Sequence, residues 1–348
     1  MAFFGKQISL GKSVTLIGGR DSLTEMRILF SVDGFDSIAV FDSVKLMIFR
    51  YRSDTLKQSN VVFRLYPLTS EWNEDGCTWV LADAYTKWLK QGGDFDSSKL
   101  IAEINIEKDT TSLMLDSSKL SLYRKGFVLI PQNDGFVYLG SSQDVSSSDS
   151  MYKPQLWGFR EEDTIRFENS EEKTYYAKIN DACIIKPYEP PNLDTLIGSA
   201  YSWRVFVHFP LDTLRGLINI TSADLQVGYN NYFSPEDSLY FNCYCLSNQY
   251  EGRFSETEPV VWGRSAVESK EHSLSFSVTE LIQYWVDAPD SNFGLLLSHS
   301  YLSYNPNPSN QSLSQDNRIY ALGRITGVPK LVITYTDPPE GRFKGGDQ

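Results

Sequence analysis

The segment Phe30–Ile48 reads FSVDGFDSIAVFDSVKLMI and aligns without a gap on Phe209–Val227, which reads FPLDTLRGLINITSADLQV. The two segments are separated by a constant offset of 179 residues (209 minus 30). Apolar residues fall on apolar residues along the alignment, and Asp33 falls on Asp212. An offset of about one domain length predicts two folded units of one type rather than a solenoid.

The pattern inside each copy is that of β-strands. Apolar and polar residues alternate with a period of two, as in Ser202–Phe209 (SWRVFVHF), and turn signals separate such runs at short intervals. The best helical pattern is Val278–Val286 (VTELIQYWV), with Thr279 as the expected N-cap and a counterpart near Ser117–Tyr123. The fold class is therefore predicted as all-β, with two tandem β-sandwich or jelly-roll domains that each carry at most a short helix.

The expected domains follow the repeat. The first β-sandwich is expected at residues 1–165, the second at residues 166–337, and a flexible C-terminal tail at residues 338–348. The boundary falls in the charged segment Arg160–Thr174, which contains no Gly or Pro and therefore predicts a short, ordered linker. The tail contains Pro and Gly and is expected to lie outside the core.

Charge and hydropathy limit the partners. The net charge is −12, and an acidic surface repels phosphate backbones, so nucleic-acid binding is disfavoured. No run of about eighteen apolar residues exists, so no membrane-spanning helix is expected. The first sixteen residues, MAFFGKQISLGKSVTL, lack an apolar run of the length found in signal peptides. We therefore expect synthesis in the host cytoplasm without a signal peptide.

The order of several short motifs resembles the DNRLRE-type domain, a β-sandwich module of the TGF-β-propeptide-like kind. The second copy carries most of them: RVFVHF at 204–209, ADLQV at 223–227, SVTELI at 277–282, NFGL at 292–295 and PKL at 329–331. The first copy keeps EWNE at 71–74, GGD at 92–94, GFV at 126–128 and PQL at 154–156, but has Glu25 where the second has Arg204. The resemblance implies a sandwich fold similar to carbohydrate-binding jelly rolls, and the EWNEDGCTW and KQGGDFDSS stretches resemble phage-encoded members.

Residues suited to catalysis are scarce. The chain contains three histidines, no Gly-x-Ser-x-Gly elbow and no glycine-rich phosphate loop. The four cysteines show no zinc-ligand spacing, and Cys243 and Cys245 fall on one face of a strand, which is typical of buried residues. We therefore predict a protein that is not an enzyme and has no catalytic residues or cofactor.

Asp94 and Asp96, in the sequence GGDFDSS, are weak candidates for a structural calcium site. Calcium takes carboxylate and carbonyl oxygens from flexible loops. Plain turn residues are the alternative for both aspartates, because aspartate is common in turns.

Aromatic residues in polar segments are the candidates for contact surfaces, since exposed Tyr beside Asn and Ser is typical of such surfaces. The apolar N-terminal arm MAFF adds two more, as an anchor that becomes ordered only against a neighbour. The expected interaction residues are Phe3, Phe4, Tyr229, Tyr232, Phe233, Tyr301 and Tyr304.

These features predict a non-enzymatic structural protein, most specifically a bacteriophage virion component such as a head-decoration, collar or tail-accessory protein. It would dock through loops and termini on other virion proteins in a symmetric assembly. The alternative is a carbohydrate-binding or surface-adhesion module whose partner is a host-surface glycan.

Overall fold

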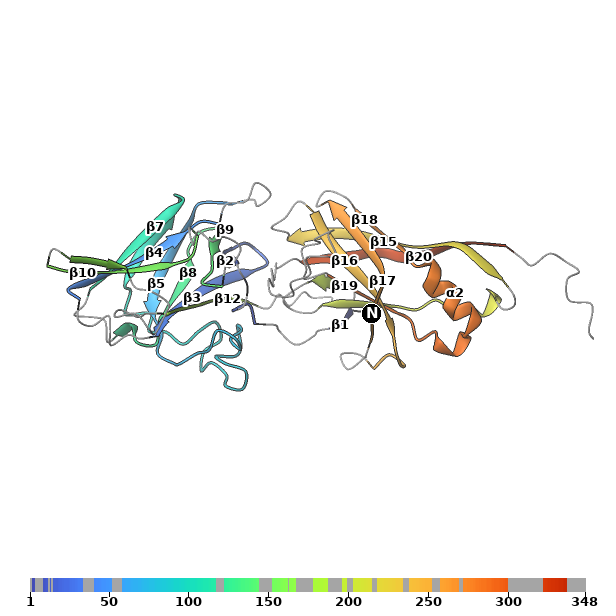
Figure 1. The fold of residues 1–348 in the computed structure, drawn as a ribbon, viewed down its shortest axis with the longest axis horizontal. Coiled ribbons are helices and arrows are strands. Elements are labelled where there is room, and N and C mark those ends of the chain that lie inside the picture. Colours follow the sequence, from blue (N-terminus) through green and yellow to red (C-terminus); the bar gives the residue numbers. More distant parts are fainter. Residues whose placement is uncertain are drawn as a thin grey trace, which may run out of the picture. The chain divides into compact units, whose positions relative to one another are not determined.

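The computed structural model is built almost entirely of antiparallel strands (Figure 1). It describes residues 2–3, 9–11, 13, 15–33, 41–51, 58–116, 122–143, 152–161, 163–166, 178–186, 196–198, 203–214, 218–233, 238–251, 257–268, 272–299 and 322–336. The predicted all-β sandwich class is confirmed: several antiparallel sheets carry the fold, with a single α-helix, α2, among the described residues.

The chain divides into two compact units later than the sequence predicted. The N-terminal unit includes Gln7–Glu189, and the C-terminal unit includes Pro190–Tyr304, Tyr320–Gln348 and Met1–Lys6. The expected boundary at 165/166 is displaced because Lys178–Ile185 forms strand β12, which pairs antiparallel with β3 (Glu25–Asp33). The expected tail at 338–348 lies outside the described residues.

The N-terminal unit has two sheets. The larger has the strand order β6-β5-β8-β3-β2-β9, with β12 also paired to β3. Its other strands are β2 (Thr15–Arg20), β5 (Val61–Pro67), β6 (Ala102–Ile106), β8 (Phe127–Pro131) and β9 (Gly135–Gly140). The smaller sheet has the order β11-β10-β4-β7, formed by β4 (Ser43–Phe49), β7 (Thr110–Asp116), β10 (Gln155–Arg160) and β11 (Asp163–Arg166).

The C-terminal unit also has two sheets. One has the order β1-β14-β19-β16-β17, formed by β1 (Ala2–Phe3), β14 (Arg204–Val207), β16 (Ser238–Leu246), β17 (Thr257–Glu268) and β19 (Leu295–His299). The other has the order β13-β20-β15-β18, formed by β13 (Leu196–Gly198), β15 (Asn219–Phe233), β18 (Ser273–Ser277) and β20 (Leu322–Thr336). The helix α2 (Thr279–Asp287) and the 3-10 turns η2 (Asp212–Leu214) and η4 (Pro289–Ser291) complete the unit.

The strand pairings confirm that the two copies share one plan. The order β6-β5-β8-β3 of the first unit recurs as β17-β16-β19-β14 in the second, and β10-β4-β7 recurs as β20-β15-β18. Leu46 pairs with Leu156, and the residue aligned with Leu46, Leu225, pairs with Leu331. The alignment is looser elsewhere, since Phe30 lies within β3 whereas Phe209 follows the end of β14.

Each unit has its own apolar core, made from residues of both of its sheets. Phe30 and Phe63 of the larger N-terminal sheet pack with Leu46 of the smaller one. In the C-terminal unit, Phe241 of one sheet and Leu225 of the other belong to a single core in the same way. Burial of such side chains between two sheets, at roughly 1.5–3 kcal/mol each, is the main stabilising contribution in a sandwich.

The predicted helix forms as α2, but it begins one residue before the start that the expected N-cap implies. Its N-cap is Val278, without a side-chain hydrogen bond, so Thr279 is not the N-cap. The Thr279 hydroxyl instead accepts the Ala223 N–H at 3.0 Å, which ties α2 to β15. Of the expected counterpart at Ser117–Tyr123, the described residues are Leu122 and Tyr123, which lie in a 3-10 turn. No helix in the described part of the chain has the length and apolar character needed to cross a bilayer.

Gly126 directly precedes β8, and its substitution tests how closely the backbone of the N-terminal unit is packed. Its φ is +91°, and an added Cβ would lie 2.1 Å from the Phe30 carbonyl oxygen. Gly93 has a similar φ of +98°, but its nearest neighbour would lie 3.5 Å away. Gly93→Ala is therefore expected to cost about 1–2 kcal/mol of unfolding free energy, and Gly126→Ala at least about 1 kcal/mol more. Urea denaturation followed by circular dichroism measures both, and equal costs would contradict the packing described.

Candidate functional site

The chain between β5 and β6, residues 68–101, forms a long loop over the outer face of the larger N-terminal sheet. We call it the β5–β6 loop. Leu29 of β3, Val128 of β8 and Ile184 of β12 point away from the main core and are fully buried or nearly so. The loop covers them with Trp79 and Trp88, each 5% exposed, among other apolar residues. This second core anchors the underside of the loop.

Two buried or half-buried indole groups fix the path of the loop. The Trp88 indole N–H donates to the Thr78 carbonyl at 2.8 Å. The Trp72 indole N–H donates to the Lys125 carbonyl at 3.2 Å. Since many backbone N–H groups of the loop, among them those of Thr78 and Ala82, also donate within it, the loop has a defined conformation despite lacking regular secondary structure.

Asp94 is the polar centre of the loop. Its carboxylate is 4% exposed and accepts the Ser70 hydroxyl at 2.8 Å and the backbone N–H groups of Leu89 at 3.0 Å and Lys90 at 2.6 Å. Each carboxylate oxygen therefore has a protein donor. Charge-assisted hydrogen bonds of this kind are stronger than neutral ones and suit a structural role for Asp94.

Asp96, the other weak calcium candidate, has a different environment. It accepts the backbone N–H and the hydroxyl of Ser98, at 3.0 and 2.6 Å, and lies 3.6 Å from the Lys99 ammonium. The two aspartates thus engage separate sets of protein donors, as expected for turn residues. Among the described residues, no group of three or more His, Cys, Asp or Glu side chains is placed to hold a metal ion.

Arg27 of β3 connects the loop to the sheet. Its guanidinium carbon lies 4.6 Å from the centre of the Trp79 ring, and its Nη1 donates to the Gly92 carbonyl at 2.7 Å. Its Nη2 lies 2.7 Å from the Glu25 carboxylate. Cation–π and charge-assisted contacts at a site this enclosed hold the loop more firmly than an exposed ion pair would.

The outer side of the same loop carries two large side chains in nearly full contact with solvent. Tyr85 is 95% exposed and Leu89 is 94% exposed. Asp83 accepts the backbone N–H groups of Tyr85 and Thr86, both at 2.7 Å, which fixes the turn that presents the tyrosine. The exposed Lys87 and Lys90 flank the pair. We call residues 83–90 the loop tip.

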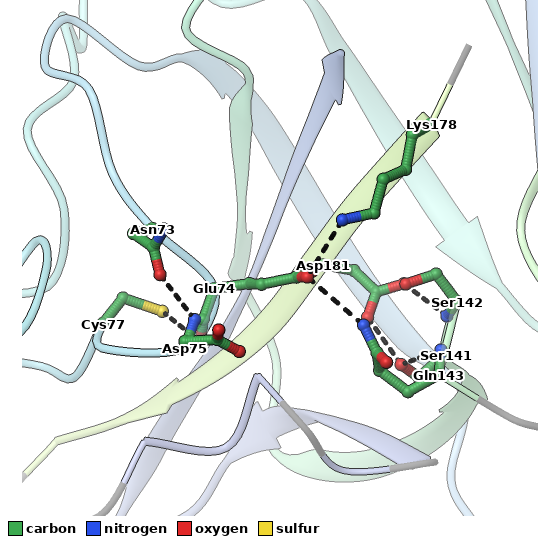
Figure 2. Close-up of polar contacts among 9 residues, drawn as sticks. All are labelled: Asn73, Glu74, Asp75, Cys77, Ser141, Ser142, Gln143, Lys178 and Asp181. Atoms are coloured by element: carbon green, nitrogen blue, oxygen red, sulfur yellow. Dashed lines mark hydrogen bonds and ion pairs between the residues drawn. The ribbon is translucent and has the colours of Figure 1, made fainter. Parts of the chain in front are cut away.

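A buried polar cluster lies at the other side of the loop, where it meets β12 (Figure 2). The Glu74 carboxylate, 12% exposed, lies 3.5 Å from the Lys178 ammonium and accepts the Gln143 amide at 3.3 Å. Asp181 is fully buried and accepts the Ser141 hydroxyl and the Ser142 N–H, both at 2.6 Å. The cluster therefore joins the loop to β12 and to residues that follow β9.

The cluster contains two carboxyl groups, those of Glu74 and Asp181, and a single ammonium group, that of Lys178. Burial raises the pKa of Asp181 to about 7, partly offset by its hydrogen bonds to Ser141 and Ser142. Burial also raises the pKa of Glu74, against the opposing charge of Lys178. A carboxyl group with a pKa near neutrality is often catalytic, but Asp181 has no exposed surface and cannot meet a substrate.

The predicted contact residues of the C-terminal unit differ in their exposure to solvent. Tyr229 is 1% exposed and belongs to the core, so its expected contact role is wrong. The reason is that β15 continues to Phe233, which places Tyr229 on the inward face together with Val227. Tyr232 is 38% exposed on the opposite face. The side chain of Phe233 lies outside the described residues.

The remaining predicted contact residues lie largely outside the described chain. Tyr301, Tyr304 and Phe4 are not described. Phe3 is described through its backbone, which pairs with Arg204 in the β1–β14 ladder. Ala2 and Phe3 of the N-terminal arm therefore form a strand in a sheet of their own chain, which differs from the expected arm that becomes ordered only against a neighbour.

Sequence analysis did not find the loop tip or the polar cluster. Tyr85, Trp88 and Leu89 lie in the segment DAYTKWLK at i, i+3 and i+4, a spacing that would place all three on one face of a helix, but the structure has no helix there. The paired motifs at 71–74 and 92–94 marked the loop, because Glu74 and Asp94 are its two polar anchors. Nothing in the spacing indicates which of the three apolar residues, Tyr85, Trp88 or Leu89, points inward.

Comparisons with known proteins do not assign this chain to a family. No family model and no curated protein matches this sequence. Among solved structures, the chain is similar to the N-terminal CBM22-1–CBM22-2 tandem domain of Xyn10C from Paenibacillus barcinonensis. The similarity covers 89% of this chain and 95% of that chain, with 8% sequence identity and a TM-score of 0.20. A TM-score this low supports no inference about the fold or a ligand.

The buried carboxyl of Asp181 predicts a pH dependence of stability. Its folded pKa of about 7 exceeds its ordinary value of 3.8, so the folded state holds the proton more tightly than the unfolded state. The stabilisation that protonated Asp181 gives the folded state is complete below about pH 4. It falls as the pH rises towards 7 and changes little above that. Each unit of difference between the folded and unfolded pKa corresponds to about 1.4 kcal/mol of unfolding free energy, so up to about 4 kcal/mol is lost over this range.

The variant Asp181→Asn isolates this contribution, because an amide can accept the Ser142 N–H and donate to the Ser141 hydroxyl as the protonated acid does. The unfolding free energy of the wild type, relative to the variant, should fall between pH 4 and pH 8 in urea titrations. Asp96→Asn is the control, since hydrogen bonds from Ser98 lower the pKa of Asp96 and it titrates below this window. Parallel pH profiles for the wild type and Asp181→Asn would contradict the assignment.

Proposed function

We propose that the chain is a non-catalytic structural protein that docks on a protein partner through the tip of its β5–β6 loop. The observation that carries the proposal is the near-complete exposure of Tyr85 and Leu89 on a loop whose underside is fixed. Apolar side chains scattered singly over a surface are ordinary, but two of this size on one anchored turn suit a binding element.

The contacts under the tip support this role. The Leu89 and Lys90 N–H groups are both held by Asp94, and the neighbouring Trp88 side chain is buried in the second core. The tip is therefore already ordered, and association loses little conformational entropy. Burial of a tyrosine and a leucine in a partner would contribute roughly 3–6 kcal/mol before the costs of association.

The charges near the tip indicate the chemistry of the partner. Lys87 and Lys90 are exposed beside Tyr85 and Leu89, on a chain whose net charge is −12. A complementary partner surface has an apolar recess with carboxylates at its rim. Tyrosine is among the residues that contribute most to protein interfaces, and charged rims mainly govern orientation and association rate.

The proposal includes a more specific placement, a bacteriophage virion component, which rests on the phage-like stretches at 71–79 and 90–98 in the sequence. Mass spectrometry of particles purified from the natural source tests it. The chain should be present in intact particles at a fixed ratio to the major structural protein, and its absence would overturn this placement.

Docking through the tip is tested by photo-crosslinking in the cells that naturally produce the chain. A photoreactive amino acid at position 85 should yield one dominant adduct with a protein partner. Leu89→Ser in the same chain should reduce that adduct severalfold, because it removes the apolar neighbour but leaves the probe in place. A probe at Val328, which is 84% exposed, is the matched control. Equal adduct yields from positions 85 and 328, or no effect of Leu89→Ser, would contradict docking through the tip.

A further inference from the structure

A small pocket opens in the C-terminal unit where η2, α2 and η4 meet. Its cavity volume is about 30 Å³, enough for a few atoms the size of a water molecule. Most of its lining is apolar, and three polar residues complete it. The lining residues are Leu211, Asp212, Leu214, Trp285, Val286, Pro289 and Asn292. A volume of this size admits one small group rather than a whole ring.

Two polar atoms of the lining are buried without a hydrogen-bond partner. The Trp285 side chain is 1% exposed, and its Nε1–H has no acceptor among the described residues. The Asn292 Oδ1 is likewise buried without a donor in the described part of the chain. A buried polar group without a hydrogen-bond partner destabilises the folded state, because it has lost its hydrogen bonds to water. The pair therefore calls for an occupant of the pocket.

The orientation of the Asn292 amide is set by the protein. Its Nδ2 donates to the Phe209 carbonyl at 2.9 Å, so the oxygen is the end left for an occupant. Two residues of the lining thus each have an unmatched polar atom: a donor in the Trp285 indole N–H and an acceptor in the Asn292 carbonyl oxygen. A hydroxyl group satisfies both at once, because it accepts one hydrogen bond and donates another.

Other functional groups fit less well. An ammonium group cannot accept the indole hydrogen, and a carboxylate cannot donate to the Asn292 oxygen. Asp212 also lines the pocket, and its negative charge disfavours anions such as carboxylates and phosphates. Leu211, Leu214 and Val286 suit the C–H groups beside such hydroxyls.

We infer that this pocket binds a hydroxyl group of a neutral polyol or sugar, through Trp285 and Asn292. The inference goes beyond the proposed docking function and involves the other unit of the chain. One or two hydroxyl contacts at a small pocket correspond to affinities of about millimolar. Specificity comes from the need for a group that both donates and accepts.

Nitrogen-15 NMR of the tryptophan indole groups in the full chain tests the inference directly. The probes are ethylene glycol, glycerol, glucose, galactose, mannose and xylose, with 1,2-dimethoxyethane as a control that cannot donate. The Trp285 indole signal, assigned by its loss in Trp285→Phe, should shift saturably with at least one hydroxylated probe. It should not shift saturably with dimethoxyethane, and the Trp262 signal should stay in place.

A blocking variant separates pocket binding from general solvent effects. Leu214→Phe adds bulk at the half-buried pocket wall and leaves Trp285 and Asn292 in the chain. It should keep the circular dichroism spectrum and the Trp285 signal but lose at least tenfold in probe affinity. If no probe shifts the Trp285 signal saturably up to its solubility limit, the pocket holds water and the inference is overturned. An affinity that is unchanged in Leu214→Phe would overturn it as well. Crosslinking at position 85 is independent of both outcomes.

Discussion

The burial of β3 on both of its faces is the constraint on which the N-terminal unit depends. Ile28 and Phe30 point into the core between the two sheets, whereas Leu29 points outward and is also fully buried. An outward-facing Leu29 must be covered, and the β5–β6 loop covers it together with Val128 and Ile184. The long loop is thus packed as part of the folded unit. Because its underside is packed, it can present side chains at fixed positions.

Polar groups fix the same loop at two points with different chemistry. Asp94 uses charge-assisted hydrogen bonds from the backbone of the tip, and Glu74 uses Lys178 and Gln143 at the far side. The second anchor adjoins a buried carboxyl, Asp181, whose pKa is raised to about 7 by burial. Such groups lower stability compared with an apolar core of equal shape, and they define the geometry that the loop adopts. In the C-terminal unit, α2 and the turns beside it hold Trp285 and Asn292 in a small pocket instead.

The sequence carried enough information to predict the repeated sheet plan but not the site. Alternation along short strands and the fixed offset indicated two similar sandwiches, and the pairing of Leu46 with Leu156 and of Leu225 with Leu331 follows that plan. The boundary was misplaced because the partner of β12 is β3, a strand about 150 residues earlier, which no local pattern reveals. Tyr229 was misjudged because Asn-rich sequence suggested a loop where β15 continues. The outward direction of Leu89 depends on the hydrogen bond of its N–H to Asp94 and on the neighbouring Trp88, whose indole N–H donates to Thr78. The sequence pattern does not reveal these contacts.

The central claim is that the β5–β6 loop is ordered before any partner arrives. Amide hydrogen exchange of the isolated chain measures this at single residues. The account predicts that the Leu89 and Lys90 amides, which donate to Asp94, exchange far more slowly than a free peptide and lose that protection in Asp94→Ala. Exchange of these amides at free-peptide rates in the wild-type chain would contradict it.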